Sequence, residues 1–555
     1  MSVGKASVSS PSLAGSAGGG GWLFGRATDL LVGAGLGYVL SIPLLVWMTG
    51  TYGLNAWPTT VFLLLSLFIS GPHYGATILR VYEHRSDRRR YATLALWATL
   101  IICGLFVGGL NNVLLGSCLV TLYATWSPWH FSGQNYGVAV MFLRRRGVVV
   151  DPLAKRFLYA SFVLAFVLSF LVMHGQSSIL SNASVPIGSL SNFQFLSIGI
   201  SREIVGWLLP IVASAYGFVL VAAAVLLLRH ARLRDLAPAS LLVLAQALWF
   251  AIPAAAPALT GQRLEGLAFT IVWISAAHAL QYLWVSFFYA RGVDPSIKLR
   301  SFLGRTLMAG SAVTILPALI FAPGLLGTVP WDNGLALLVF SVVNLHHFVL
   351  DGAIWKLRDG KVAQFLLRQV SQEDSVPAGA EAKSWFGPSM AVLGSLSLCI
   401  ALMDGWEREI NINQSDGNIE NRIAVSKRLA WIGRGSPSLH TQIARQLAMS
   451  NRPSESIEHF ERSIALFPSA AAWAGLGNLH AKHQRWADAG DAYAEAVLLK
   501  PDNAALHARA GVAYLSAHRL DLARKELERA SEIAPHSPQI QRDLARVVAA
   551  QFRGI

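Results

Sequence analysis

Five histidines stand inside apolar stretches of this sequence, where ionisable side chains are rare. An ionisable residue in such a stretch is costly and usually faces a cavity, a partner or a pathway. In the densest stretch, residues 343–356, Asn344, the pair His346–His347 and Asp351 fall within less than about three helical turns. One such stretch alone could be a structural contact between helices, so the case for chemistry rests on its recurrence. The other histidines lie in similar stretches, at His73, His130 and His278.

A polar side chain follows three of these histidines by about one helical turn. Asp351 lies four residues after His347, a spacing at which side chains share a helix face and can form a hydrogen bond. A carboxylate or amide behind an imidazole fixes the ring's tautomer and is the usual support of a metal-bound histidine. We therefore predict four supporting or catalytic residues: Gln134 for His130, Gln281 and Tyr282 for His278, and Asp351 for His347.

The elements that carry these residues are predicted to be membrane-spanning helices. The chain of 555 residues is 54% hydrophobic and only 14% charged, which is too apolar for a soluble enzyme. Apolar runs of about 20 residues, long enough to cross a bilayer as a helix, recur along most of the chain. We predict about eleven spans, at residues 28–49, 58–80, 92–110, 114–143, 156–174, 204–229, 237–257, 266–290, 302–324, 334–356 and 388–406.

Basic residues cluster after every second predicted span and set the orientation. Although the net charge is +14, the basic residues gather at helix ends, as in Arg88–Arg90 and Arg144–Arg146. This distribution indicates contact with anionic lipid and not with nucleic acid. By the positive-inside rule these ends and the N-terminus face the cytoplasm. An odd number of spans then places the C-terminal region outside, which is the periplasm for a bacterial inner-membrane protein.

The histidines on the even-numbered spans have similar predicted depths. Each precedes the basic end of its helix by 10 to 14 residues, which corresponds to roughly 15 to 21 Å along the helix axis. The hydrocarbon core is about 30 Å thick, so all of them lie near its middle. Because adjacent helical residues point about 100° apart, only one of His346 and His347 is expected to face the site. Asp351 slightly favours His347. We therefore predict that His73, His130, His278 and one of this pair are metal ligands.

Several neutral imidazoles in a dry site are suited to iron, copper or zinc. With carboxylate or amide support and open coordination positions, the set suits oxygen chemistry at non-haem iron, so iron is the first choice. The residue set, with many histidines, few cysteines and one aspartate, resembles that of integral-membrane iron oxygenases and desaturases, including the carotenoid-cleaving membrane type. The desaturase boxes HxxxH and HxxHH are absent, so the resemblance assigns no residue role.

The C-terminal part of the sequence contains a repeat. Residues 492–501 are echoed by residues 526–535, and Pro468, Pro501 and Pro535 keep a period of about 34 residues. Together with small residues where two helices would cross, this pattern resembles the tetratricopeptide repeat. The resemblance implies a helical solenoid with a concave surface that binds a protein or peptide.

The chain is therefore predicted to be all-α, a polytopic membrane helix bundle followed by a tetratricopeptide-repeat solenoid. We expect a disordered, glycine- and serine-rich N-terminus over residues 1–27 and a membrane domain over residues 28–406. A connector over residues 407–436 and repeats over residues 437–555 follow.

The leading functional interpretation is a metal-dependent membrane oxidoreductase that acts on a membrane lipid or a lipophilic small molecule. Three alternatives remain open: a haem-b protein with axial histidines, a proton or metal transporter, and an assembly factor for another membrane complex. A lipid-linked sugar transferase is disfavoured, because the first outer loop, residues 50–57, has no acidic residue.

Overall fold

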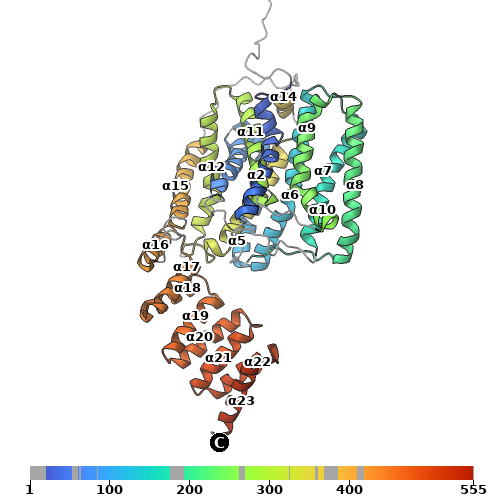
Figure 1. Cartoon of the computed structure of the whole chain (residues 1–555). Helices are drawn as coiled ribbons and strands as arrows, with labels where there is room; N and C mark the ends of the chain where they lie inside the picture. The colour runs from blue at the N-terminus through green and yellow to red at the C-terminus, as the bar shows by residue number, and fades with distance from the viewer. Residues whose placement is uncertain are drawn as a thin grey trace, which may run out of the picture. The chain divides into compact units, whose positions relative to one another are not determined.

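The computed structural model of the chain describes residues 21–52, 61, 64–83, 85–175, 193–261, 269–323, 325–356, 360–367, 385–408 and 418–553. Every regular element in these ranges is a helix, which confirms the all-α prediction (Figure 1). The chain divides into two compact units. The first comprises residues 1–186, 193–316 and 338–398, and the second comprises residues 187–192, 317–337 and 399–555.

The first unit is built from long apolar helices. Among the described residues, eight helices are long and apolar enough to cross a membrane, or nine if the bent pair Arg26–Gly33 and Leu36–Gly50 forms one span. The main helices are α2 (Leu36–Tyr52), α4 (Gly71–Tyr82), α5 (Arg85–Asn111), α6 (Val113–Arg145), α7 (Pro152–His174), α8 (Arg202–Leu228), α9 (Leu233–Gln246), α10 (Ile252–Thr260), α11 (Ile271–Val293), α12 (Leu299–Ile320), α13 (Leu335–Ile354), α14 (Gly360–Leu367) and α15 (Phe386–Trp406).

Two of the eleven predicted spans are not among these eight or nine helices. The span at residues 58–80 corresponds to a π-helical turn, Ser66–Ser70, followed by α4, and residues 58–60, 62 and 63 lie outside the described residues. The span at residues 114–143 is α6, a single helix of 33 residues that carries polar side chains along much of its length. The count of eleven therefore stays a prediction. Most of the predicted outer loop at residues 50–57 also lies outside the described residues.

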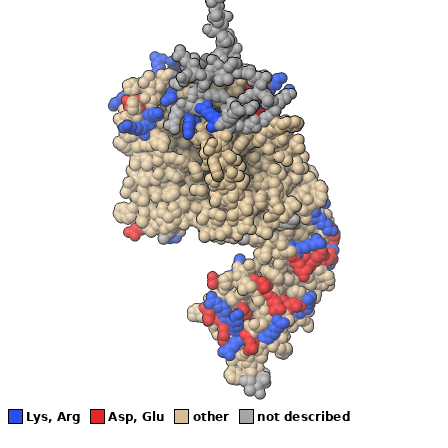
Figure 2. Space-filling view, turned by 180° about the vertical axis from the view of Figure 1, so that it is seen from behind, with Lys and Arg blue, Asp and Glu red and all other residues tan. Residues whose placement is uncertain are grey.

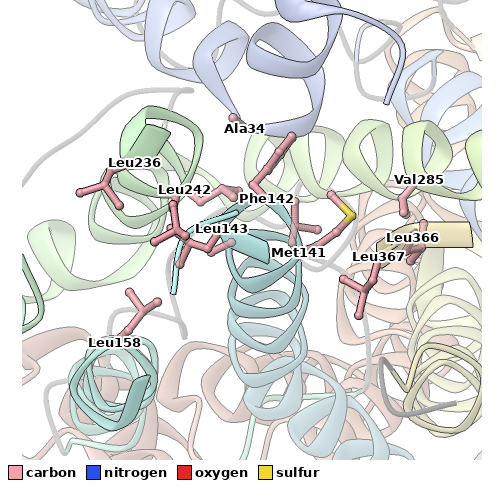
Figure 3. Close-up of a cluster of buried hydrophobic side chains, with 14 of the residues drawn as sticks. Ala34, Met141, Phe142, Leu143, Leu158, Leu236, Leu242, Val285, Leu366 and Leu367 are labelled. Atoms are coloured by element: carbon pink, nitrogen blue, oxygen red, sulfur yellow. The ribbon is translucent and has the colours of Figure 1, made fainter. Parts of the chain in front are cut away.

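Helix α6 contributes to a large apolar core of the first unit. Its residues Met141, Phe142 and Leu143 are at most 1% exposed. Close packing of side chains of this size adds many small dispersion contacts, which hold α6 against its neighbours. The apolar side chains around them come from α7, α9, α11 and α14 and include Leu158, Leu236, Leu242, Val285, Leu366 and Leu367 (Figure 3).

The segment before α2 is ordered from residue 21 onward, which corrects the prediction of disorder through residue 27. Leu23 is buried in the same apolar core. The buried carboxylate of Asp29 accepts hydrogen bonds from the backbone N–H groups of Leu23 and Phe24 and, at 3.0 Å, from Nε1 of Trp284. These tertiary contacts override the glycine-rich composition. Residues 1–20 lie outside the described residues.

Helices α4 and α12 cross with their backbones in contact. A β-carbon at Gly75 would lie 1.9 Å from the carbonyl oxygen of Thr306, and one at Gly310 would lie 1.8 Å from that of Gly71. Small residues that permit such close approach are typical of helix pairs in membranes. Because Gly71 and Gly75 flank His73 in the sequence, the crossing fixes the part of α4 that carries this histidine.

The second unit contains a series of antiparallel helix pairs. The turns inside successive pairs have the same geometry, because Asn451, Gln484 and His518 adopt left-handed φ angles of 56°, 58° and 59°. Their spacing follows the repeat period seen in the sequence. The helices are α17 (Pro437–Met449), α18 (Pro453–Leu466), α19 (Ala470–Lys482), α20 (Trp486–Leu499), α21 (Ala504–Ser516), α22 (Leu520–Ile533) and α23 (Pro538–Arg553).

The connector predicted at residues 407–436 contains a helix, α16 (Ile419–Trp431), which corrects the domain boundary. Its buried residues Val425 and Leu429 pack in one apolar cluster with Leu439 and Ile443 of α17. The solenoid therefore begins before residue 437, since α16 covers the apolar face of the first repeat helix.

Residues 317–337 also belong to the second unit, although the sequence assigns them to the membrane part. The Asp332 carboxylate accepts a hydrogen bond of 2.6 Å from the Ser436 hydroxyl. The buried guanidinium of Arg434 lies 4.0 Å from the ring centroid of Trp331, a cation–π contact. These contacts tie the short segment before α13 to the start of the repeats.

Candidate functional site

Four of the predicted histidines come together in the first unit, each from a different helix. Their imidazoles occupy the corners of a four-sided arrangement, with neighbouring rings edge to face. The ring centroids are 5.0 Å apart for His73–His278, 5.1 Å for His278–His130, 5.1 Å for His130–His347 and 4.1 Å for His347–His73. Helices α4, α6, α11 and α13 thus present four ring systems to one small volume.

The ring nitrogens of these histidines form two overlapping sets of possible metal ligands. One ligand atom each from His73, His278 and His347 lies within 4.8 Å of the others, and the same holds for His130, His347 and Asp351. Among the described residues, at least one nitrogen of each of the four imidazoles is buried and has no hydrogen-bond partner. These atoms are Nε2 of His73, His130 and His347 and both ring nitrogens of His278.

The neighbouring pair His346 and His347 divides between two environments. His347 is 2% exposed and contributes a corner of the arrangement. The Nε2 atom of His346 instead lies 2.9 Å from the Thr99 hydroxyl on α5. That hydroxyl in turn lies 3.0 Å from the hydroxyl of Tyr82. His346 is therefore outside the group of converging histidines.

Asp351 does not stand behind His347, although their spacing on α13 predicts it. The Nδ1 atom of His347 lies 2.9 Å from the hydroxyl of Thr77 on α4. The Asp351 carboxylate instead lies 3.8 Å from Nε2 of His130. The neighbouring helices decide this outcome, because α4 presents a closer partner to Nδ1 while α6 brings a second imidazole toward the carboxylate.

The two predicted supporting glutamines bond to each other and to backbone oxygens. Nε2 of Gln134 donates to Oε1 of Gln281 at 2.6 Å and to the backbone oxygen of His278 at 3.2 Å. Nε2 of Gln281 donates to the backbone oxygen of Gly33 at 2.9 Å. These bonds correct the prediction that each glutamine supports an imidazole. The pair instead joins α6 and α11 to the bend before α2.

Tyr282 belongs to a chain of hydrogen bonds that starts at His347. Its hydroxyl lies 2.6 Å from the Thr77 hydroxyl and accepts a 3.0 Å bond from Nε1 of Trp355. Thr77 and Trp355 are therefore site residues that sequence reasoning missed. Thr77 follows His73 by four residues, the same spacing that led to Gln134 and Asp351, so this signal was present in the sequence.

Aromatic rings cover two of the four imidazoles. The ring of Phe348 stacks on His130 with a centroid separation of 4.3 Å, and the ring of Phe131 stacks on His278 at 4.1 Å. Each phenylalanine follows a site histidine directly in the sequence, yet only the structure shows which imidazole it covers. These contacts limit water access and help to hold the ring planes.

A pocket of about 340 Å³ lies next to the histidines. His130, Gln134, Tyr282 and Asp351 form part of its wall, so three of the four predicted supporting residues and one histidine face the same space. The remaining lining is mostly apolar or aromatic and comprises Trp126, Trp129, Gly133, Gly137, Val138, Met141, Val285, Phe348, Gly352, Trp355 and Leu366.

Comparisons with known proteins inform the second unit. Residues 480–547 match the family model of the tetratricopeptide repeat. No curated protein matches the chain. The first tetratricopeptide repeat domain of Spaghetti (RPAP3), solved bound to an HSP90 peptide, is 17% identical to this chain with a TM-score of 0.20, covering 21% of this chain and 93% of that one. The crystal structure of MamA is 19% identical with a TM-score of 0.22, covering 25% of this chain and 81% of that one.

The repeats are identified by the family model and by the helix pairs, and not by these weak structural likenesses. The matched residues span α20, α21 and α22, and the same turn geometry extends back to the pair α17–α18. The C-terminal region of this chain is therefore a tetratricopeptide-repeat solenoid.

Proposed function

We propose that this chain is an integral-membrane oxidoreductase in which a histidine-bound metal ion acts on a lipophilic substrate. The observation that carries the proposal is the group of buried imidazole nitrogens without hydrogen-bond partners among the described residues. Leaving one buried polar atom unsatisfied costs about 1–3 kcal/mol. Each ring can bind a metal ion through one of these nitrogens, so a metal ion held by several of the rings would supply the missing partner.

The donor set supports a transition metal. Imidazole nitrogens are typical ligands of iron, copper and zinc, and the carboxylate of Asp351 adds an oxygen donor typical of iron sites. The rings of Phe131 and Phe348 make the surroundings apolar, which suits redox chemistry that water would disturb. Iron remains our first choice, with copper and zinc as alternatives.

A haem b fits this arrangement less well than a metal ion. Two axial histidines of a haem face each other across a broad porphyrin plane. Here each imidazole has two further imidazoles with centroids 4.1 to 5.1 Å away, in the space that a porphyrin would need.

Placement in a membrane is supported by the surface of the first unit. The described helices include eight with the length and apolarity of a membrane span. On the face shown in Figure 2, a broad band of this unit is almost free of charged side chains, and basic residues gather at one end of the band. This pattern agrees with the proposed inner-membrane location, in which the basic ends face the cytoplasm.

The solenoid supports a second role, the binding of a protein or peptide. Helical repeats of this kind present an extended concave surface to which such partners bind. We propose that the repeats recruit a protein or peptide partner outside the cytoplasm, on the side opposite the basic ends.

Metal analysis of purified protein tests the proposal. The wild-type chain, purified in mild detergent, should contain iron, copper or zinc in a near-integer ratio to protein. Replacement of His73, His130, His278 or His347 by alanine should remove most of this metal. The matched control is His346→Ala, which changes the adjacent histidine that bonds to Thr99, and it should retain the metal.

Two results would count against the proposal. One is a monodisperse wild-type protein without bound metal under several loading conditions. The other is equal metal loss in His346→Ala and His347→Ala, which would point to general destabilisation. A haemochrome spectrum of the wild-type protein would identify the haem alternative directly.

A further inference from the structure

We propose that the pocket beside the histidines is a slot for a long-chain lipophilic molecule that carries one hydroxyl or carbonyl group. We propose further that this molecule enters sideways between α6 and α13. The inference names the substrate class for the proposed function and rests on it, although binding to the slot can be measured without metal or activity. Its support comes from the slot's shape, its walls and its opening.

The slot is elongated. Its lining residues on α6 run from Trp126 to Met141 at helical spacing, so they cover roughly 22 Å along the helix axis. On α13 they run from Phe348 to Gly352, and Trp355, directly after the helix, lines the same space. A volume of about 340 Å³ spread over such a length makes a narrow slot and not a rounded chamber. Its shape fits a single extended chain better than a compact ring system.

Three glycines create the space between the two helices. A β-carbon at Gly133, Gly137 or Gly352 would have no heavy atom within 4 Å, so each glycine borders open room. Gly75 on α4 is different, because there the missing β-carbon allows two backbones to touch. The glycines of the slot are therefore not required for helix packing, and larger side chains at these positions would narrow the slot.

The walls have an apolar part and a polar part. The side chains of Trp126, Trp129 and Phe348 offer large apolar surfaces to a chain. The polar part is formed by His130, Gln134, Tyr282 and Asp351. The amide of Gln134 and the carboxylate of Asp351 carry acceptor oxygens, so a hydroxyl on the bound molecule would find an acceptor at this part of the wall.

The slot opens on the side of the first unit. Trp129 is 40% exposed, and the surfaces of Gly133 and Gly352 are also exposed. These residues lie within one helical turn of His130 and Asp351, so the opening is at the same depth as the histidines. In the proposed orientation that depth is near the middle of the bilayer, where apolar molecules are dissolved. A substrate could therefore enter from the lipid without crossing water.

Photolabelling of the full-length protein in lipid nanodiscs tests this inference. The probe is a hexadecanol derivative with a diazirine in the middle of its chain, and the adducts are mapped by mass spectrometry. They should concentrate on residues 126–141 and 348–355. Gly137→Leu should reduce them at least about tenfold, because the added side chain fills the slot. Gly217→Leu on α8, where a β-carbon also meets nothing within 4 Å, is the matched control and should leave them unchanged.

Competition with unlabelled molecules tests whether the slot requires a polar group on the bound chain. Unlabelled hexadecanol should displace the probe more strongly than hexadecane of the same chain length. Equal competition would overturn the requirement for a hydroxyl or carbonyl group. Adducts spread over all exposed helices in proportion to their surface, or adducts insensitive to Gly137→Leu, would overturn the slot itself.

Metal content measured on the same samples distinguishes this inference from the proposed function. If the slot is labelled in a protein that never binds metal, the lipophilic binding site is supported and the proposed oxidoreductase function is contradicted. If the protein binds stoichiometric metal but its slot is not labelled, the metal site is supported and the lipophilic binding site is contradicted. Gly137→Leu should retain its metal, because Gly137 is not among the possible ligands.

Discussion

At the residue scale, the hydrogen bond between Thr77 and His347 decides which nitrogen of His347 is available. The Thr77 hydroxyl lies 2.9 Å from Nδ1 of His347, so Nε2 is the nitrogen that is available to bind a metal ion. A group that holds the far side of a metal-bound imidazole fixes its tautomer and orientation. Thr77 has this position for His347, and the hydroxyl of Tyr282 lies behind Thr77.

We expect Thr77→Val to weaken metal binding about 10- to 100-fold while leaving the protein folded. Valine keeps the shape of threonine but cannot hold Nδ1. Thr77→Ser retains the hydroxyl and should bind metal nearly as well as the wild type. Titration with the metal found in the wild-type protein measures both variants. Equal affinity in Thr77→Val and the wild type would show that the bond to His347 has no positioning role.

A second pair of histidines, His440 and His459 in the repeats, should make the repeats less stable in acid. Nδ1 of His440 lies 3.0 Å from Nδ1 of His459, so one of these atoms donates and the other accepts. A protonated imidazole has only donors. Burial, followed by the nearby His459 and Arg462, lowers the pKa of His440 to about 4, and burial also lowers the pKa of His459.

Because these folded-state pKa values lie below that of an unfolded histidine, the unfolded chain binds more protons as the pH falls below about 6.5. The stability of α17 and α18 should therefore be complete at pH 7 and should decrease toward pH 4. Hydrogen exchange of the full-length protein, corrected for the intrinsic effect of pH, measures this loss. The double variant His440→Gln/His459→Gln should lose the pH dependence, and its persistence there would assign it to other groups.

The sequence predicts which histidines meet but not how their side chains are paired. Counting residues to the basic helix ends places His73, His130, His278 and the pair at 346–347 at one depth, and the four imidazoles do converge in the structure. Rotation about each helix axis cannot be obtained from such a count. The contact between Asp351 and His130 depends on this rotation, as does the bond between the two glutamines, so local spacing predicts the wrong partners.

At the element scale, the contact between α4 and α12 links helix packing to the site. Gly75→Ala should destabilise the first unit and lower its metal content, because the new methyl group would collide with a backbone carbonyl that cannot move aside. Gly304→Ala on α12 adds the same methyl group where nothing lies within 4 Å, so it should be neutral or slightly stabilising. Thermal unfolding in detergent and metal analysis compare the two. Similar behaviour of both variants would contradict the packing argument.

The helices themselves are predictable to different degrees. Apolar runs and repeat prolines identify the long helices and the solenoid, since both signals are local. Helix α16 carries mixed charges and a short apolar stripe. The residues of this stripe are buried because α17 packs against them. The ordered residues around Leu23 likewise depend on partners far away in the sequence, including Trp284. Such elements cannot be recognised from their own composition.

At the scale of the whole molecule, the proposed orientation makes a prediction about the chain's end. A reporter active only outside the cytoplasm, fused after Ile555, should be active, because the predicted eleven spans would place the repeats on the side opposite the basic ends. The same reporter inserted after Arg146, at the basic end of α6, should be inactive. A reporter active only in the cytoplasm should show the reverse. Cytoplasmic activity at Ile555 would mean that the chain has an even number of spans.

The positions of the four site histidines along the chain also affect when the site can assemble during synthesis. The four histidines lie on helices that the ribosome makes at different times. Thr77 of α4 and its hydrogen-bond partner His347 of α13 are 270 positions apart in the sequence. The complete set of proposed metal ligands therefore does not exist until α13 has left the ribosome and joined the earlier helices. Both possible ligand sets include His347 of α13, so neither set is complete on α4, α6 and α11 alone. Loading of the metal would thus be a late step in assembly, performed on a bundle that is already formed.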